Sequence, residues 1–158
     1  MNSFFGEVYS RFGHRFPIGA IYEQGYFARP FPRSTKKLLL LYCPRNPVSF
    51  SQIYPFFFYE REIAEQFGVS VRAVPTDQYQ TALLGDADTI CVQTDFAADS
   101  DYIHNLFADI RSRNSDARIV YLDWFAPLDL RMAEKVNHHV DLYVKRQAFS
   151  DPHSYHAS

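Results

Sequence analysis

The sequence of 158 residues has few of the features that mark secreted, membrane or phosphate-binding proteins. It holds only 2 cysteines, Cys43 and Cys91, which is too few for a disulfide framework and favours a reducing compartment. The longest apolar runs, at residues 38–43 and 54–59, fall far short of the ~20 residues that a membrane-spanning helix needs. Charged residues interrupt every apolar stretch near the N-terminus, so no signal peptide is expected. We therefore expect a cytoplasmic protein without a transmembrane segment.

Aromatic side chains are abundant, and charge is unevenly distributed. Aromatics make up 17% of the residues, with 15 Phe, 11 Tyr and 1 Trp, and the net charge is -2. Residues 1–37 carry a net charge of +4, whereas residues 38–158 carry -6. Arginine beside aromatic residues, as in the first segment, can bind nucleic acid. Because the acidic remainder would repel a phosphate backbone, we expect no nucleic-acid partner.

The chain divides into one domain with an irregular segment at each end, and its length suits a single domain. Residues 1–35 include Arg29-Pro30-Phe31-Pro32-Arg33, in which two prolines block a helix. We interpret these residues as a basic, aromatic arm that packs on the body or awaits a partner. Residues 36–150 are predicted to be the folded domain, and residues 151–158 a polar tail.

From residue 36 onward, short apolar runs alternate with amphipathic segments. Strands are predicted at residues 38–43, 69–75, 88–93, 118–123 and 140–144. Helices are predicted at residues 49–67, 77–84, 99–113 and 127–137, with Gly68 as a C-terminal stop and Asp99 or Ser100 as an N-cap. This alternation predicts an α/β fold: a doubly wound, mostly parallel five-stranded Rossmann-like sheet with helices on both faces.

The motifs of common nucleotide-binding and hydrolytic folds are absent from the sequence. After the first predicted strand it reads Cys43-Pro44-Arg45-Asn46-Pro47, without the G-x-G-x-x-G that lets the backbone approach a pyrophosphate. It also lacks G-x-x-x-x-G-K-[ST] and G-x-S-x-G. A phospho-receiver domain would need acidic residues where the first strand ends in Tyr42 and Cys43. We therefore expect no nucleotide cofactor.

The candidate site lies at the carboxyl ends of the predicted strands, where open parallel sheets bind ligands. Asp95 and Asp123 are candidate catalytic residues, each able to accept a proton from a sugar hydroxyl. The candidate substrate-binding residues are Arg45, Asn46, Thr94, Trp124 and Lys145. Trp124 would stack on a sugar ring. The alternative is that these polar residues only cap turns and that Trp124 fills the core.

Histidine spacing gives little support for a metal site. His138 and His139 are adjacent, so they point to different faces of a helix or strand. His153 and His156 have a suitable spacing but lie in the polar tail. With no second His or Cys cluster in register, no metal is expected.

Two stretches of the C-terminal third resemble bacterial glycosyltransferase-like proteins of polysaccharide biosynthesis. They are Asp123-Trp124-Phe125-Ala126-Pro127-Leu128-Asp129-Leu130-Arg131 and Val140-Asp141-Leu142-Tyr143-Val144-Lys145-Arg146. In that family such stretches belong to the N-terminal, Rossmann-like half of a two-domain, GT-B type fold. The resemblance implies a domain that faces a sugar or lipid-linked glycan acceptor, while a second domain holds the nucleotide-sugar.

Three functions remain open at this point. The first is the acceptor-side half of a sugar transferase, which is not expected to be active alone. The second is a non-catalytic binding or oligomerisation module of the same fold. The third is a small stand-alone enzyme that uses Asp95 or Asp123. A downstream domain in the source gene would separate the first from the other two.

Overall fold

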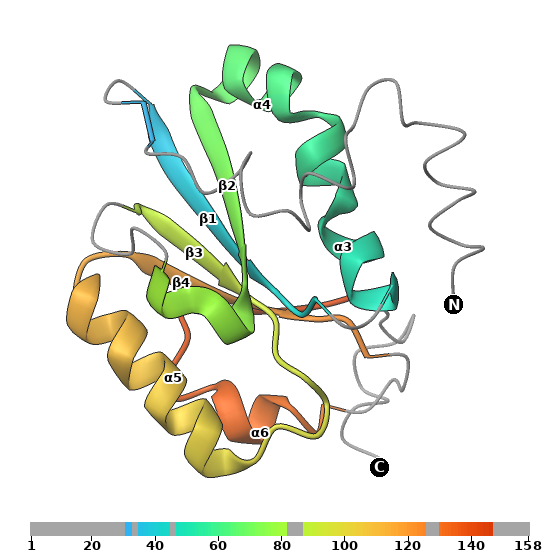
Figure 1. Ribbon diagram of the computed structural model, residues 1–158, viewed down its shortest axis with the longest axis vertical. Helices are drawn as coiled ribbons and strands as arrows, with labels where there is room; N and C mark the ends of the chain where they lie inside the picture. Colours follow the sequence, from blue (N-terminus) through green and yellow to red (C-terminus); the bar gives the residue numbers. More distant parts are fainter. Residues whose placement is uncertain (1–30, 33–34, 45–46, 82–86, 126–129, 147–158) are drawn as a thin grey trace.

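The structure is a computed structural model that describes residues 31–32, 35–44, 47–81, 87–125 and 130–146 (Figure 1). The predicted arm lies outside these residues except for Phe31, Pro32 and Thr35, and the predicted tail lies outside them completely. Phe31 is buried, at 8% exposure, and the Arg72 guanidinium lies 5.5 Å from its ring centroid. At least one aromatic side chain of the predicted arm therefore packs on the domain.

Five parallel strands form one sheet in the order β2-β1-β3-β4-β5. They are β1 (Lys36–Tyr42), β2 (Val69–Pro75), β3 (Thr89–Val92), β4 (Arg118–Asp123) and β5 (Leu142–Lys145). β1 is an interior strand, and Leu40 is paired with Ala73 on one side and with Cys91 on the other. The predicted α/β class and five-stranded Rossmann-like sheet are confirmed, and every strand pair is parallel.

Helices cover both faces of the sheet (Figure 1). One face carries α3 (Pro47–Phe58) and α4 (Glu60–Phe67), and the other carries the 3-10 helix η1 (Thr76–Thr81), α5 (Ser100–Arg113) and α6 (Ala133–Val136). Two separate cores result, because side chains alternate between the faces along each strand. Residues of α3 pack with Leu40 in one core, and residues of α5 pack with Leu41 in the other. Within the described residues, no helix has the length and apolar character to cross a membrane.

The predicted helix at residues 49–67 is two helices. Pro55 lies inside α3, where it can donate no backbone hydrogen bond and crowds the preceding turn. One turn later, Tyr59 departs from helical geometry with φ -104° and ψ 20°, and α4 begins at the next residue. Gly68 ends α4 with a φ of 64°, in the left-handed region that glycine tolerates best, so the predicted stop is confirmed.

The other helices match their predictions unevenly. α5 begins after Asp99, whose carboxylate accepts a hydrogen bond from the Tyr102 N–H at 2.7 Å, as expected of an N-cap. The segment predicted as a helix at residues 77–84 is the 3-10 helix η1 as far as it is described. Of the helix predicted at residues 127–137, the described part is α-helical only in α6, and residues 127–129 lie outside the described set.

Candidate functional site

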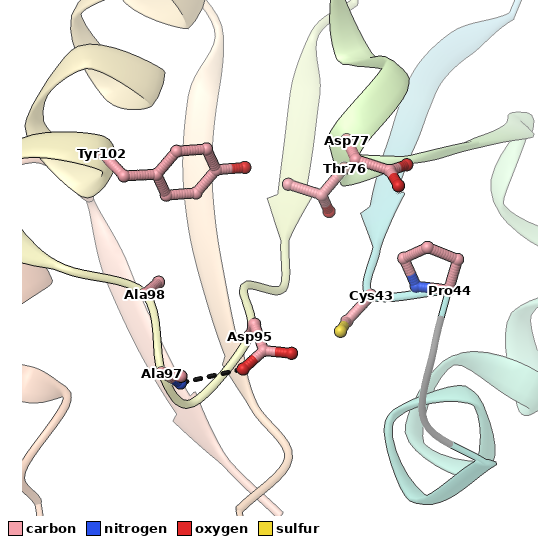
Figure 2. Close-up of a pocket in the computed structure, with 8 residues that line it drawn as sticks. All are labelled: Cys43, Pro44, Thr76, Asp77, Asp95, Ala97, Ala98 and Tyr102. Carbon is pink, nitrogen blue, oxygen red and sulfur yellow. Dashed lines mark hydrogen bonds between the residues drawn. The ribbon is translucent and has the colours of Figure 1, made fainter.

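A pocket of about 300 Å³ opens at the carboxyl end of the sheet (Figure 2). Its walls come from the ends of β1, β2 and β3 and from the first turn of α5. The lining residues are Cys43, Pro44, Thr76, Asp77, Asp95, Ala97, Ala98 and Tyr102. From β1 the chain continues to β2 on one side, while β3 lies on the other side. The order in which strands are added to the sheet thus reverses at β1, and open α/β sheets bind ligands at such a point.

The pocket presents carboxylates and hydroxyls, and none of its described lining residues is a lysine or an arginine. Asp77 and Asp95 contribute the carboxylates, and Thr76 and Tyr102 contribute the hydroxyls. In Figure 2 the Tyr102 hydroxyl points from α5 toward the space between the strands. Burial, followed by nearby Tyr79 and Asp77, raises the pKa of Tyr102. Its hydroxyl therefore stays protonated near neutral pH and can donate a hydrogen bond.

Asp95, a candidate catalytic residue, lies at the pocket with an exposed side chain. Its Oδ1 accepts a hydrogen bond from the Ala97 N–H at 2.8 Å, which fixes the turn after β3. The Ala98 N–H donates to the Asp95 backbone carbonyl at 3.1 Å in the same turn. Among the described residues, Oδ2 of Asp95 has no hydrogen-bond partner. One carboxylate oxygen is thus available to a ligand.

Asp123, the other candidate catalytic residue, lies in a closed cluster at the ends of β4 and β5. It is 1% exposed, and its Oδ2 accepts hydrogen bonds from Lys145 Nζ at 2.8 Å and from the Tyr143 hydroxyl. Its Oδ1 accepts from the Phe125 N–H at 2.9 Å. Lys145 is itself almost enclosed, with 6% of its side chain exposed. The protein therefore uses both oxygens of Asp123 internally, which suits a structural role.

Thr94 and Trp124 belong to the same closed region. Thr94 is 1% exposed, and its hydroxyl is hydrogen-bonded to that of Tyr121 at 2.8 Å. Trp124 is 4% exposed, donates from Nε1 to the Thr94 carbonyl at 2.9 Å and packs edge-on against Phe125. Stacking of Trp124 on a sugar ring would require this contact to open.

The structure therefore separates the predicted site into two parts. Asp123, Thr94, Trp124 and Lys145 lie in or beside the closed cluster, whereas Asp95 lies at the pocket. Arg45 and Asn46 lie outside the described residues.

Of the eight lining residues only Asp95 was predicted from the sequence, and three of the others carry a hydroxyl or a carboxyl group. Thr76 and Asp77 follow β2, and Tyr102 lies in the first turn of α5. The available signal was that Thr76 and Asp77 are polar residues directly after a strand. This signal predicts a pocket residue only when the strand order is known, because only the ends of neighbouring strands can line the same pocket.

Cysteine and histidine side chains show no metal-binding arrangement within the described part of the chain. No group of three or more His, Cys, Asp or Glu residues could hold a metal ion there. Cys43 and Cys91 are both buried and are not in a disulfide. Burial raises the pKa of Cys91 to about 12, which suits an inert side chain of the core.

Comparison with known proteins does not assign this chain to a family. No protein-family model matches the sequence. No curated protein matches it either. One solved structure with a similar fold is described as the crystal structure of adenylate cyclase from Rhodopirellula baltica. The two share 15% sequence identity over 73% of this chain and 79% of that chain, with a TM-score of 0.48. The class of this protein, a doubly wound α/β domain, thus rests on its own strand order and helix layers.

Proposed function

We propose that this chain is a non-catalytic binding domain whose pocket holds an uncharged, hydroxyl-rich group such as a sugar of a glycan. The observation that carries the proposal is the set of lining groups at the change of direction between β1 and β3. Asp77 and Asp95 can each accept hydrogen bonds from ligand hydroxyls, and bonds to an ionised acceptor are the stronger kind. The Tyr102 hydroxyl can donate to a ring or hydroxyl oxygen.

The same lining groups disfavour a phosphorylated ligand. A diphosphate needs backbone N–H groups at a helix N-terminus, a lysine or arginine clamp, or a metal ion. The first turn of α5 does lie at the pocket, but its Tyr102 N–H is already bonded to the Asp99 carboxylate. The described lining residues supply two carboxylates, and like charges repel at short range. A nucleotide-sugar is therefore a poorer ligand than the free sugar or glycan.

The non-catalytic assignment follows from the candidate acids. Asp123 is bonded through both oxygens to groups of the protein, so it has no oxygen directed to a substrate. Asp95 is exposed to water, and one of its oxygens has no hydrogen-bond partner within the described residues. A carboxylate open to bulk water is not held in the water-excluded setting in which enzymes carry out proton transfer.

A second candidate function is the acceptor-side half of a two-domain sugar transferase in polysaccharide biosynthesis. Oδ2 of Asp95 favours it, because this oxygen has no partner in the described part of the chain and can accept the proton of an acceptor hydroxyl once a second domain excludes water. In that case the isolated chain binds the acceptor and transfers nothing. A second domain or a second copy of the chain would be the partner.

The test is calorimetric titration of the full chain with a panel of neutral glycans and with nucleotide-sugars. We expect weak binding of at least one glycan, with affinity reduced roughly ten-fold in Asp95→Asn because a charge-assisted bond becomes a neutral one. The matched control is Asp116→Asn, an exposed aspartate in the turn after α5. Tighter binding of a nucleotide-sugar than of any glycan, or equal glycan affinity in Asp95→Asn, would contradict the proposal.

A further inference from the structure

Gln93 is a buried amide that directly follows β3, between that strand and the loop that carries Asp95. Its exposed fraction is 0%. Burial of an amide is unfavourable unless its donors and its acceptor are hydrogen-bonded. The partners of Gln93 therefore show what this side chain holds in place.

Both ends of the Gln93 amide are bonded to the protein. Oε1 accepts from the Cys43 N–H at 3.3 Å. Nε2 donates to the Ser49 carbonyl at 3.0 Å and to Oε1 of Gln52 at 2.8 Å. The backbone carbonyl of Gln93 accepts from the Thr76 hydroxyl at 2.7 Å. These four hydrogen bonds at the carboxyl end of the sheet add to the one that the backbone N–H of Gln93 donates to β1.

These partners belong to three different elements around the pocket. Cys43 follows β1 and Thr76 begins η1 after β2, and both line the pocket (Figure 2). Ser49 and Gln52 belong to α3, on the other side of the strand ends. The Ser49 hydroxyl also donates to the Cys43 carbonyl at 2.7 Å, so Cys43 is held through both of its backbone polar groups. Gln93 therefore joins two pocket walls to the helix behind them.

We propose that Gln93 is a positioning residue of the pocket. Its side-chain amide fixes Cys43 before a ligand enters, which lowers the ordering cost of binding, and its backbone carbonyl holds Thr76. The inference rests on the proposed function, since a fixed pocket matters only if a ligand binds there. Gln93 itself does not line the pocket.

The chemistry of the amide suggests a nearly isosteric test. In Gln93→Glu, the introduced carboxylate can accept from the Cys43 N–H but cannot donate to Ser49 or Gln52. Burial raises the pKa of such a carboxyl, and its protonated form regains one donor. The pocket of the variant should therefore become more like that of the wild type as the pH falls.

The experiment compares amide NMR spectra of the ligand-free full chain and of Gln93→Glu at about pH 8 and about pH 5. We expect the amide signals of Cys43 and Ser49, which contact the side chain of residue 93, to shift at the higher pH and to return toward wild-type positions at the lower pH. The Thr76 signal should move less, because the Thr76 hydroxyl is bonded to the backbone carbonyl of residue 93, which the substitution keeps. Gln66→Glu, an exposed change on α4, introduces the same charge and should leave these signals in place at both pH values. Glycan affinity relative to the wild type should fall roughly ten-fold at the higher pH and recover at the lower one.

Three further outcomes would contradict either the inference or the proposed function. Unchanged pocket amides at the higher pH, or a change that does not reverse at the lower pH, would show that Gln93 does not position the pocket. A variant unfolded at both pH values would show that Gln93 serves the fold as a whole. If the wild type binds no glycan, the proposed function fails, while the ligand-free spectra still decide the role of Gln93.

Discussion

The two halves of the carboxyl edge contain similar residue types and use them in opposite ways. At the ends of β1, β2 and β3, Asp77, Asp95 and Tyr102 line a pocket. At the ends of β4 and β5, Asp123 and its tyrosine and lysine partners are bonded to one another, and Asp123 is 1% exposed. We call these halves the open half and the closed half.

The difference shows that a polar residue at the carboxyl end of a parallel strand is not necessarily a binding residue. In the closed half, Lys145 Nζ donates a hydrogen bond to Oδ2 of Asp123, the oxygen that a ligand would otherwise contact. In the open half, one oxygen of Asp95 has no partner among the described residues. Substitutions should therefore affect stability in the closed half and binding in the open half.

The largest expected effect is in the closed half. Lys145→Met should lower the free energy of unfolding by about 4 kcal/mol, because it leaves the buried Asp123 carboxylate without its cation. The double variant Asp123→Asn/Lys145→Met should recover at least half of this loss, because the uncompensated charge is gone. Urea denaturation measures both. Lys36→Met, at an exposed lysine of β1, is the control, and an equal loss there would remove the distinction.

The next largest effect concerns Trp124. Trp124→Ala should cost about 3 kcal/mol in unfolding free energy, since a buried ring and its hydrogen bond to Thr94 are lost. Trp124→Phe should cost less, because a ring still packs against Phe125. Thermal and urea denaturation test these values. Lost glycan binding with unchanged stability would instead mean that Trp124 stacks on the ligand.

The two cysteines allow a chemical test of access to the pocket. Cys43 lines the pocket, whereas Cys91 lies in β3 with its pKa raised to about 12 by burial. Both side chains are buried, so native-state alkylation near neutral pH should be slow at both, but roughly ten-fold faster at Cys43 because only Cys43 borders the pocket. Peptide mapping by mass spectrometry separates the two sites. Equal rates would show that labelling proceeds through global unfolding and does not report on the pocket.

The smallest effect on stability is expected at Asp95. Asp95→Asn should change the free energy of unfolding by less than about 0.5 kcal/mol, because the side chain is exposed and asparagine can still accept from Ala97. The same variant should weaken glycan binding, as described above. A loss of stability comparable with that of Lys145→Met would place Asp95 among the structural residues and erase the contrast between the halves.

Much of the fold was predictable from local patterns. The bounds of β2 and β4 agree with the predicted residues 69–75 and 118–123, because apolar runs flanked by turn residues mark buried parallel strands. Gly68 and Asp99 were predictable as helix ends, since each satisfies a backbone requirement that few residues meet. The division of residues 49–67 was missed because Pro55 alone did not show where the helix would stop.

The site was less predictable because it depends on the strand order. The sequence places Asp95 and Asp123 at equivalent positions, yet only the first lies at the pocket. Nothing in the spacing shows that Tyr143 and Lys145 meet Asp123, since that contact follows from the pairing of β4 with β5. Likewise, Asp77 can be recognised as a pocket residue only once the structure shows that β2, β1 and β3 are neighbours.

The strand order also bears on how the chain folds while it is being made. β2 pairs with β1, and β3, β4 and β5 each pair with a strand that precedes them in the sequence. Once β1 and β2 have been made, no later strand of this sheet waits for a partner encoded further downstream. During synthesis at ~5–20 residues per second, each strand can join the sheet as it leaves the ribosome. The long-range pairing of an all-parallel sheet is slow to form from a complete unfolded chain. In this sheet the strand order lets the pairs form in the order of translation.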